Sequence, residues 1–181
     1  MTKAEQYQAR IQRCNRAQLF ALWREKQEGV LSTFWKPGKF LEYAILRAFE
    51  LEGAIVTYPY EVPVFGKVIE QIDGAIRIGD LYSLIECKDY SDTPLDFVPI
   101  AKLRSILARR HASTFGMVFS MSNYTEPAEI SLGHIHPQMI ILWGRGEIEY
   151  CMENGCFVDF FRKKYKSAIE RCEYNDPCNL I

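Results

Sequence analysis

The chain has 181 residues, of which 48% are hydrophobic and 25% are charged, and its formal net charge is -1 at pH 7. This composition excludes an intrinsically disordered chain, and the near-zero charge excludes a protein that coats nucleic acid through overall basicity. Any phosphate binding therefore needs a local cluster of basic side chains. The six cysteines form no CxxC pair and no run of 18 apolar residues occurs, which favours a cytoplasmic protein with reduced thiols and no membrane partner.

An amphipathic helix is predicted over residues 3–28, where good helix formers such as Gln, Ala, Arg and Leu dominate. Its apolar positions at helical spacing are Leu19, Leu22 and Trp23. This face either joins the core or docks a partner subunit. A break follows, and a second helix is predicted over residues 39–52. We therefore expect an N-terminal helix and linker over residues 1–37, and a second domain over residues 38–181.

Beyond residue 53 the hydrophobic pattern changes from helical spacing to strand spacing. Strands are predicted at residues 54–58, 68–78, 81–90, 115–121 and 138–143. Helices are predicted at residues 94–111, 126–132 and 156–171. Strands that alternate with helices in this way predict an α/β fold of three layers, in which a central mixed β-sheet lies between two layers of helices.

Four polar residues in the strands at 68–78 and 81–90 are predicted to share one face of the sheet. The stretch IRIGDLYSL between the strands predicts a hairpin with a two-residue Gly-Asp turn. The register of that hairpin sets Asp73 opposite Glu86, and Gln71 opposite Lys88. Because side chains along a strand alternate between its two faces, all four side chains project from the same face.

Two carboxylates that face each other across a strand pair repel, so this arrangement needs compensation. A divalent cation such as Mg²⁺ or Mn²⁺, bound by Asp73, Glu86 and a neighbouring backbone carbonyl, would supply it. Lys88 beside such an ion can orient or deprotonate a bound water and offset the charge of a phosphate. Glu42, on the predicted helix 39–52, is placed to reach the same site. A lone Glu-x-Lys is more often a solvated strand end, but the two additional acids favour a site.

This set of residues resembles the catalytic constellation of the PD-(D/E)XK nuclease superfamily, with Glu42 in a helix, Asp73 in IDGAI, and Glu86 and Lys88 in ECK. The resemblance implies a restriction-endonuclease-like αβα core that binds DNA and hydrolyses its phosphodiester bonds with Mg²⁺. It implies Asp73 and Glu86 as metal ligands and Lys88 as the catalytic lysine. It also implies Glu42 as an accessory acid that acts through water.

A second stretch, FGMVFSMSNYTEPAEISL, is similar to the strand, turn and helix start of Mrr-like restriction endonucleases. Tyr124, Thr125 and Ala128 stand in the matching positions. Two positions depart from the pattern. Ile72 replaces the proline that precedes the acid, and Glu86 stands where many Mrr-like proteins have glutamine.

Further DNA contacts are predicted around these motifs. Basic residues on the helix after the catalytic strand either bind phosphates or form the solvated face of that helix. Polar residues before the helix 126–132 either bind a phosphate at its N-terminus or serve as turn and cap residues. The predicted DNA contacts are Gln71, Lys102, Arg104, Ser122 and Asn123.

The function predicted from these patterns is a Mg²⁺- or Mn²⁺-dependent endonuclease that acts on DNA in restriction, defence or DNA processing. We expect either a homodimer or a subunit held to a partner through the N-terminal helix. Two alternatives remain open. One is a catalytically silent nuclease fold that binds DNA or serves in assembly, and the other is a hydrolase of another phosphate ester.

Overall fold

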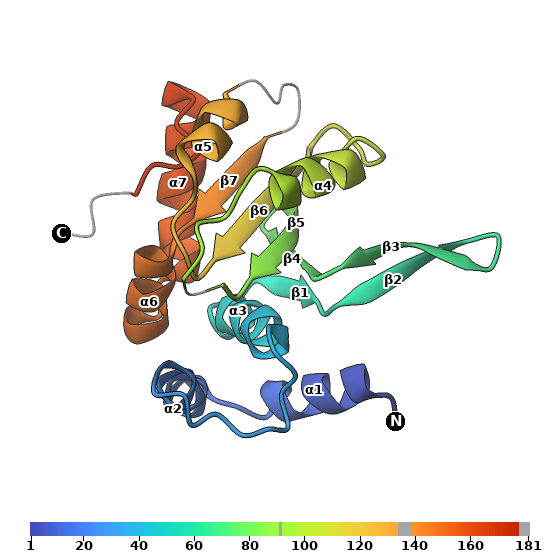
Figure 1. Ribbon diagram of the computed structural model, residues 1–181, viewed down its shortest axis with the longest axis vertical. Helices are drawn as coiled ribbons and strands as arrows, with labels where there is room; N and C mark the ends of the chain where they lie inside the picture. The colour runs from blue at the N-terminus through green and yellow to red at the C-terminus, as the bar shows by residue number, and fades with distance from the viewer. Residues whose placement is uncertain (91, 134–138, 178–181) are drawn as a thin grey trace.

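The computed structural model describes residues 1–90, 92–133 and 139–177 (Figure 1). Its helices are α1 (Lys3–Gln12), α2 (Arg16–Gln27), α3 (Lys39–Leu51), α4 (Val98–Leu107), α5 (Glu126–Leu132), α6 (Arg145–Asn154) and α7 (Phe157–Arg171). Its strands are β1 (Ile55–Thr57), β2 (Tyr60–Val64), β3 (Lys67–Ile72), β4 (Gly74–Ile78), β5 (Leu81–Lys88), β6 (Thr114–Ser120) and β7 (Ile140–Trp143). Over these ranges, no helix combines the length and the apolar character that crossing a membrane requires.

A five-stranded mixed sheet in the order β1-β4-β5-β6-β7 lies at the centre of the fold. The strands β1, β4 and β5 are antiparallel, whereas β5, β6 and β7 are parallel. Buried residues of α3, α6 and α7 form one hydrophobic cluster with the sheet, and those of α4 and α5 form another. The helices therefore cover both faces, as Figure 1 shows. The predicted α/β class, a mixed sheet between two helical layers, is confirmed.

Aromatic side chains join the sheet to the helices on the α3 side. Phe49 of α3 contacts Phe119 of β6 and Phe157 of α7, with ring centroids 6.1 and 5.2 Å apart. Trp143 of β7 is fully buried and stacks on Phe119 at 5.1 Å. Each such side chain contributes about 2–3 kcal/mol through the apolar surface that it removes from water. This packing fixes α3, and with it Glu42, against the sheet.

The single helix predicted over residues 3–28 is wrong, because the chain breaks at residues 13–15 into α1 and α2. Asn15 caps α2 by accepting a hydrogen bond from the backbone N–H of Gln18, whose side chain bonds back to the backbone of Asn15. Asparagine favours caps over helix interiors, so it ends the helical run. Both helices share a hydrophobic cluster with α3. The domain boundary predicted at residue 38 stays a prediction.

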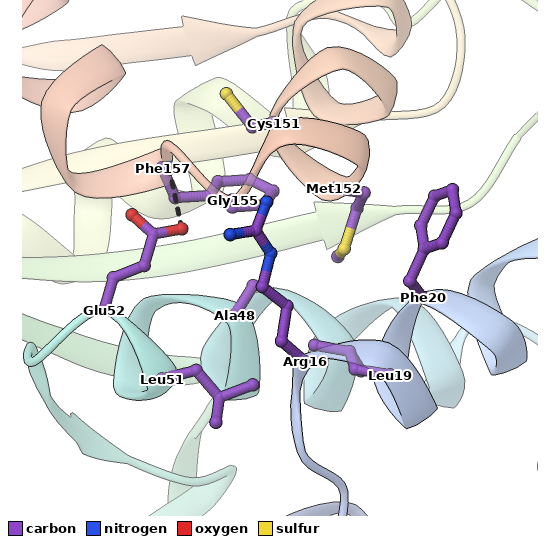
Figure 2. Close-up of a pocket in the computed structure, with 10 residues that line it drawn as sticks. All are labelled: Arg16, Leu19, Phe20, Ala48, Leu51, Glu52, Cys151, Met152, Gly155 and Phe157. Carbon is purple, nitrogen blue, oxygen red and sulfur yellow. Dashed lines mark hydrogen bonds between the residues drawn. The ribbon is translucent and has the colours of Figure 1, made fainter.

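The contact of α2 with α6 and α7 surrounds a small cavity of about 130 Å³, which Figure 2 shows. The guanidinium of Arg16 occupies the space where Gly155 has no side chain, since a Cβ there would lie 2.2 Å from the Arg16 Cζ. On the other side, the Glu52 carboxylate accepts hydrogen bonds from the backbone N–H groups of Phe157 and Val158. The Arg16 contact joins α2 to the end of α6, and the Glu52 contacts join the end of α3 to the start of α7.

Two elements differ from the sequence predictions in the region that precedes the hairpin. The strand predicted over residues 68–78 is divided at Asp73, so that β3 pairs with β2 in a separate two-stranded sheet and β4 joins the main sheet. The sequence pattern missed β2, which contains Pro63, and also α6. Gln71 consequently lies opposite Glu61, and the predicted register that set it opposite Lys88 is wrong.

The β2–β3 hairpin extends away from the rest of the molecule in Figure 1. Its carboxylate Glu70 is buried and forms ion pairs with Arg109 and Arg110, which follow α4. These two guanidinium groups anchor the base of the hairpin to the helical layer.

The five cysteines among the described residues are free thiols, and Cys178 lies outside the described residues.

Candidate active site

The predicted hairpin register between β4 and β5 is confirmed, from the pair Ile78 and Leu81 to the pair Gly74 and Ile85. Asp73 directly precedes this ladder, at its open end. Its Oδ2 accepts a hydrogen bond of 2.8 Å from the backbone N–H of Cys87. The carboxylate of Asp73 therefore lies beside the segment that carries Glu86 and Lys88.

Glu86 carries a carboxylate that is almost fully buried, with 1% of the residue exposed. Lys88 donates to its Oε1 at 2.7 Å, and Lys102 of α4 donates to both carboxylate oxygens at 3.1 Å. A buried carboxylate is costly unless opposite charge and hydrogen bonds compensate it. Two ammonium groups from different elements supply that compensation here.

Glu42 is buried on the first turn of α3 and reaches the same site from the helical layer. Lys39 donates to both of its carboxylate oxygens at 2.8 Å. Burial and the nearby charge of Asp73 nevertheless raise the pKa of Glu42 from 4.5 to about 7, because Lys39 offsets them only in part. Burial and the charge of Glu86 likewise raise the pKa of Asp73. The acids at this site therefore repel one another and lack sufficient positive charge.

Lys88 keeps its proton in this environment. Burial lowers the pKa of its ammonium, but the hydrogen bond and the charge of Glu86, with the charge of Asp73, outweigh burial and raise it. A protonated lysine donates hydrogen bonds and offsets negative charge, and it does not act as a base. The raised pKa of Lys88 thus favours the electrostatic role among those considered for this residue.

We predict that Glu42→Gln stabilises the metal-free protein at pH 8, by about 2–3 kcal/mol. The pKa of Glu42 is higher in the folded state (about 7) than its ordinary value of 4.5, so folding favours the protonated form. The wild-type protein therefore loses stability as the pH rises from 4.5 to 7, and the neutral glutamine removes that loss. Urea denaturation at several pH values in EDTA measures the effect.

The gain from Glu42→Gln should shrink as the pH falls from 7 towards 4.5 and vanish well below 4.5, where the wild-type carboxyl is protonated in both states. Glu153→Gln is the matched control, because Glu153 is exposed on α6 and its removal should leave the pH dependence unchanged. A Glu42→Gln protein that is less stable than the wild type at pH 8 would contradict the prediction.

The donor chemistry of the site fits a hard divalent cation. Within the described ranges, no group of three or more His, Cys, Asp or Glu side chains is arranged to hold a metal ion. Mg²⁺, however, often takes only one or two carboxylates and completes its shell with water and substrate phosphates. Asp73 and Glu86 match that requirement. The unmet need of Asp73 for positive charge, seen in its raised pKa, is what such an ion would supply.

The other predicted site residues lie in different environments. Arg104 and Asn123 are exposed, while Gln71 is exposed on the β2–β3 hairpin, where it bonds to Glu61. The Ser122 hydroxyl is buried and bonds to the hydroxyl of Ser120 at 3.0 Å. Lys102 is the one of these residues that contacts the acids, through Glu86. Their roles in DNA binding stay predictions.

Two lysines that contact the site region were missed in the sequence. Lys39 precedes Glu42 by three residues, a helical spacing that could have indicated their pairing. Lys26 of α2 forms a 2.8 Å ion pair with Asp89, immediately after β5. No local pattern relates those two residues, which lie 63 positions apart in the sequence.

A groove of about 370 Å³ opens beside the acids, between the end of β5 and the start of α4. Its lining residues are Glu86, Lys88, Tyr90, Thr93, Pro94, Leu95, Asp96, Val98, Pro99 and Lys102. The backbone of Leu95 bonds to that of Asn123 and Thr125, so the loop before α4 is joined to the segment between β6 and α5. The site is therefore accessible from solvent on the side where Lys88 and Lys102 lie.

The sequence matches no known protein-family model and no curated protein. Three solved structures resemble the fold. A protein of unknown function, AF1548, is 18% identical with a TM-score of 0.45, over 59% of this chain and 57% of that one. The DNA modification-dependent restriction endonuclease AspBHI is 18% identical with a TM-score of 0.46, over 93% of this chain and 43% of that one. The MspJI restriction endonuclease, solved in complex with a 27-mer oligonucleotide, is 15% identical with a TM-score of 0.45, over 91% and 38%.

The chain thus spans between 38% and 57% of the length of these three proteins. Such low identities and TM-scores below 0.5 are too weak to assign an activity. The class of protein is defined by the molecule itself, as an α/β fold in which three acids and a lysine converge where β4 begins and β5 ends.

Proposed function

We propose that the protein is a divalent-metal-dependent endonuclease that hydrolyses phosphodiester bonds in DNA. The observation that carries the proposal is the convergence of Glu42, Asp73, Glu86 and Lys88 from three separate elements. These residue types match the PD-(D/E)XK constellation that the sequence resembles. The Mrr-like assignment rests only on the sequence stretch around Tyr124 and goes no further than that resemblance.

In this proposal, Asp73 and Glu86 would hold Mg²⁺ or Mn²⁺, and the ion would polarise the phosphate and make a water molecule more acidic. The protonated Lys88 donates to a phosphate oxygen and offsets charge that develops there. Glu42 does not contact the phosphate directly in this proposal, which is consistent with the hydrogen bonds that Lys39 donates to its carboxylate. Lys102 borders the groove and adds a second positive charge next to the phosphate.

The direct test is incubation of supercoiled, linear and branched DNA with the purified protein and Mg²⁺ or Mn²⁺. Cleavage by the wild type and none by Asp73→Asn is the expected result. Intact substrates in every reaction, with the wild type and Lys88→Ala indistinguishable, would overturn the proposal. Nucleotides and other phosphate esters tested in parallel address the alternative of a hydrolase of a different substrate.

One observation favours the alternative of a catalytically silent subunit. Both lysines that contact Glu86 compensate its charge without a metal, and a scaffold protein would need no more than that. Metal binding separates the two functions. In the proposed nuclease, Mn²⁺ must compete with Lys102 for Glu86, because Lys102 is half exposed and belongs to another element.

We predict that Lys102→Gln raises the affinity for Mn²⁺ about tenfold in the absence of DNA, since it removes this competition. Isothermal titration calorimetry of both proteins with Mn²⁺ measures this affinity. Arg104→Gln removes an equal charge from the same helix, and among the described residues Arg104 has no side-chain hydrogen bond or ion pair, so it is the matched control. Equal affinities of Lys102→Gln and the wild type would contradict the prediction, and Mn²⁺ binding by neither protein would support the scaffold.

Oligomerisation stays a prediction. A homodimer, or a partner subunit bound to the N-terminal helices, would place a second site on the opposite strand of a duplex. Sedimentation velocity at several protein concentrations, with and without a DNA duplex, measures the stoichiometry directly.

A further inference from the structure

The charge of the chain is divided unevenly along the sequence. Residues 1–39 contain eight Lys or Arg and three Asp or Glu, a net charge of +5, so residues 40–181 carry -6 to give the total of -1. The near-zero total therefore hides a strongly basic N-terminal segment joined to an acidic body. A local cluster of this kind is what phosphate binding requires of a protein without net positive charge.

Five of these basic residues surround the segment between α2 and α3, and we call them the N-terminal basic surface. Its members are Lys3, Arg10, Lys26, Lys36 and Lys39. Lys3 Nζ and Arg10 Cζ lie 4.3 and 4.7 Å from the ring centroid of Phe34. Such cation–π contacts position a cation while they leave its outer face free for another ligand.

The middle of the N-terminal basic surface is hollowed. A groove of about 520 Å³ lies between the segment 31–38 and the end of β5. Lys26 and Lys36 line it, together with Trp35, Phe40 and Asp89. Lys36 is exposed, and among the described residues its ammonium has no hydrogen bond or ion pair. It is therefore available for an anionic ligand.

The N-terminal basic surface adjoins the candidate active site at two points. Lys39 contacts Glu42, and Lys26 contacts Asp89, the residue after Lys88. Figure 1 shows α1 and α2 beyond α3, on the side opposite to α4. The acids of the site thus lie between two sources of positive charge, the N-terminal basic surface and the groove that Lys102 borders.

We propose that the N-terminal basic surface binds the phosphate backbone of a DNA duplex whose scissile bond lies at the acidic site. The inference deepens the proposed function and rests on it for the identity of the substrate. Its own support is charge complementarity, continuity with the site, and an exposed lysine in a groove beside it. The surface binds phosphates without reading bases, because point charges on Lys and Arg position a duplex and carry no sequence information by themselves.

Two of the three acidic residues of the segment are engaged away from this surface, and the third is Glu25 of α2. Glu5 is engaged at the start of α1, where it bonds to the backbone N–H of Thr2. Glu28 pairs with Arg24, which is outside the surface. The buried side chains of Leu19 and Trp23 pack α2 into the same hydrophobic cluster as α3, which keeps the surface beside the site.

The test is the salt dependence of DNA affinity, measured by fluorescence anisotropy of a labelled duplex in EDTA, where no cleavage occurs. The double variant Arg10→Gln/Lys36→Gln should bind more weakly, and the slope of log K against log salt should fall by about 2, close to 0.9 for each lost phosphate contact. The control is Lys163→Gln/Lys166→Gln, which removes the same charge from exposed positions on α7. Its slope should equal that of the wild type.

Equal slopes for the wild type and Arg10→Gln/Lys36→Gln would overturn the inference. Equal losses of DNA affinity and of slope in both double variants would also overturn it. Loss of self-association without loss of DNA affinity would identify the surface as a protein interface and would also overturn it. The proposed nuclease activity is judged separately. If the slope falls in Arg10→Gln/Lys36→Gln but the wild type cleaves no DNA in Mg²⁺, the inference about the DNA-binding surface holds and the proposed nuclease activity is rejected. If the wild type cleaves DNA but the slope is unchanged in the double variant, the nuclease activity holds and the inference about the surface is rejected.

Discussion

Replacement of Lys88 by methionine should lower the rate of DNA cleavage by about 100- to 1,000-fold, the usual cost of losing one donor that stabilises transition-state charge. The methionine keeps the length and the apolar stem of lysine and removes only the ammonium. Lys102 continues to compensate Glu86 in this variant, so the fold should persist. Single-turnover nicking of supercoiled DNA in Mg²⁺ measures the rate.

The Lys88→Met experiment separates an electrostatic role from a structural one through two further measurements. Because Glu86 loses one competing ammonium, Mn²⁺ affinity should be retained or raised, while the chemical step is slow. Lys88→Arg keeps the charge and should recover part of the rate. A Lys88→Met protein that cleaves at the wild-type rate would show that Lys88 does not contact the reacting phosphate.

Replacement of Gly74 by alanine should destabilise the protein by about 3 kcal/mol, through a strained backbone and overpacking. Gly74 has a φ of +156°, and a Cβ there would lie 2.7 Å from Leu46 Cδ1 and 2.9 Å from the backbone oxygen of Thr57. Leu46 can change rotamer, but the backbone oxygen of Thr57 belongs to β1 and cannot move without breaking the sheet. Urea denaturation followed by circular dichroism measures the loss.

The control for Gly74→Ala is Gly133→Ala at the end of α5. Gly133 has a right-handed helical conformation with φ of -59°, and its nearest neighbour to a Cβ would be 3.6 Å away. This substitution should change stability by less than about 0.5 kcal/mol. If both alanines cost the same, the close approach at Gly74 does not constrain the fold. Because Asp73 precedes Gly74, the destabilised variant should also bind Mn²⁺ less tightly.

The buried acids lower the stability of the fold. Glu42 and Asp73 are buried with too little positive charge, and their raised pKa values are the physical sign of that cost. A protein selected for stability alone would replace Glu42 with a neutral residue. The stabilisation expected for Glu42→Gln, if accompanied by loss of cleavage, would indicate that these acids are retained for catalysis.

Features that depend on neighbours along the chain could be predicted before the fold was known. The period of the apolar residues predicted α3, β5, β6 and α5 closely, and the Gly-Asp turn predicted the register of β4 and β5, because a two-residue turn leaves few alternatives. From that register followed the proximity of Asp73 to Glu86. The site acids could be predicted because hairpin geometry is local.

Tertiary structure alone decided the features that depend on distant residues. Residues 68–78 read as one strand around the Asp73-Gly74 pair, but the structure places the two halves in different sheets, with Gly74 in close contact with α3 and β1. Lys102 reaches Glu86, and Lys26 reaches Asp89, because separately folded helices pack beside β5. Side-chain pairing across such distances is set by packing, which has no periodic signature in a sequence. For that reason the charge balance of the site, and the position of the basic N-terminal segment beside it, follow only from the fold.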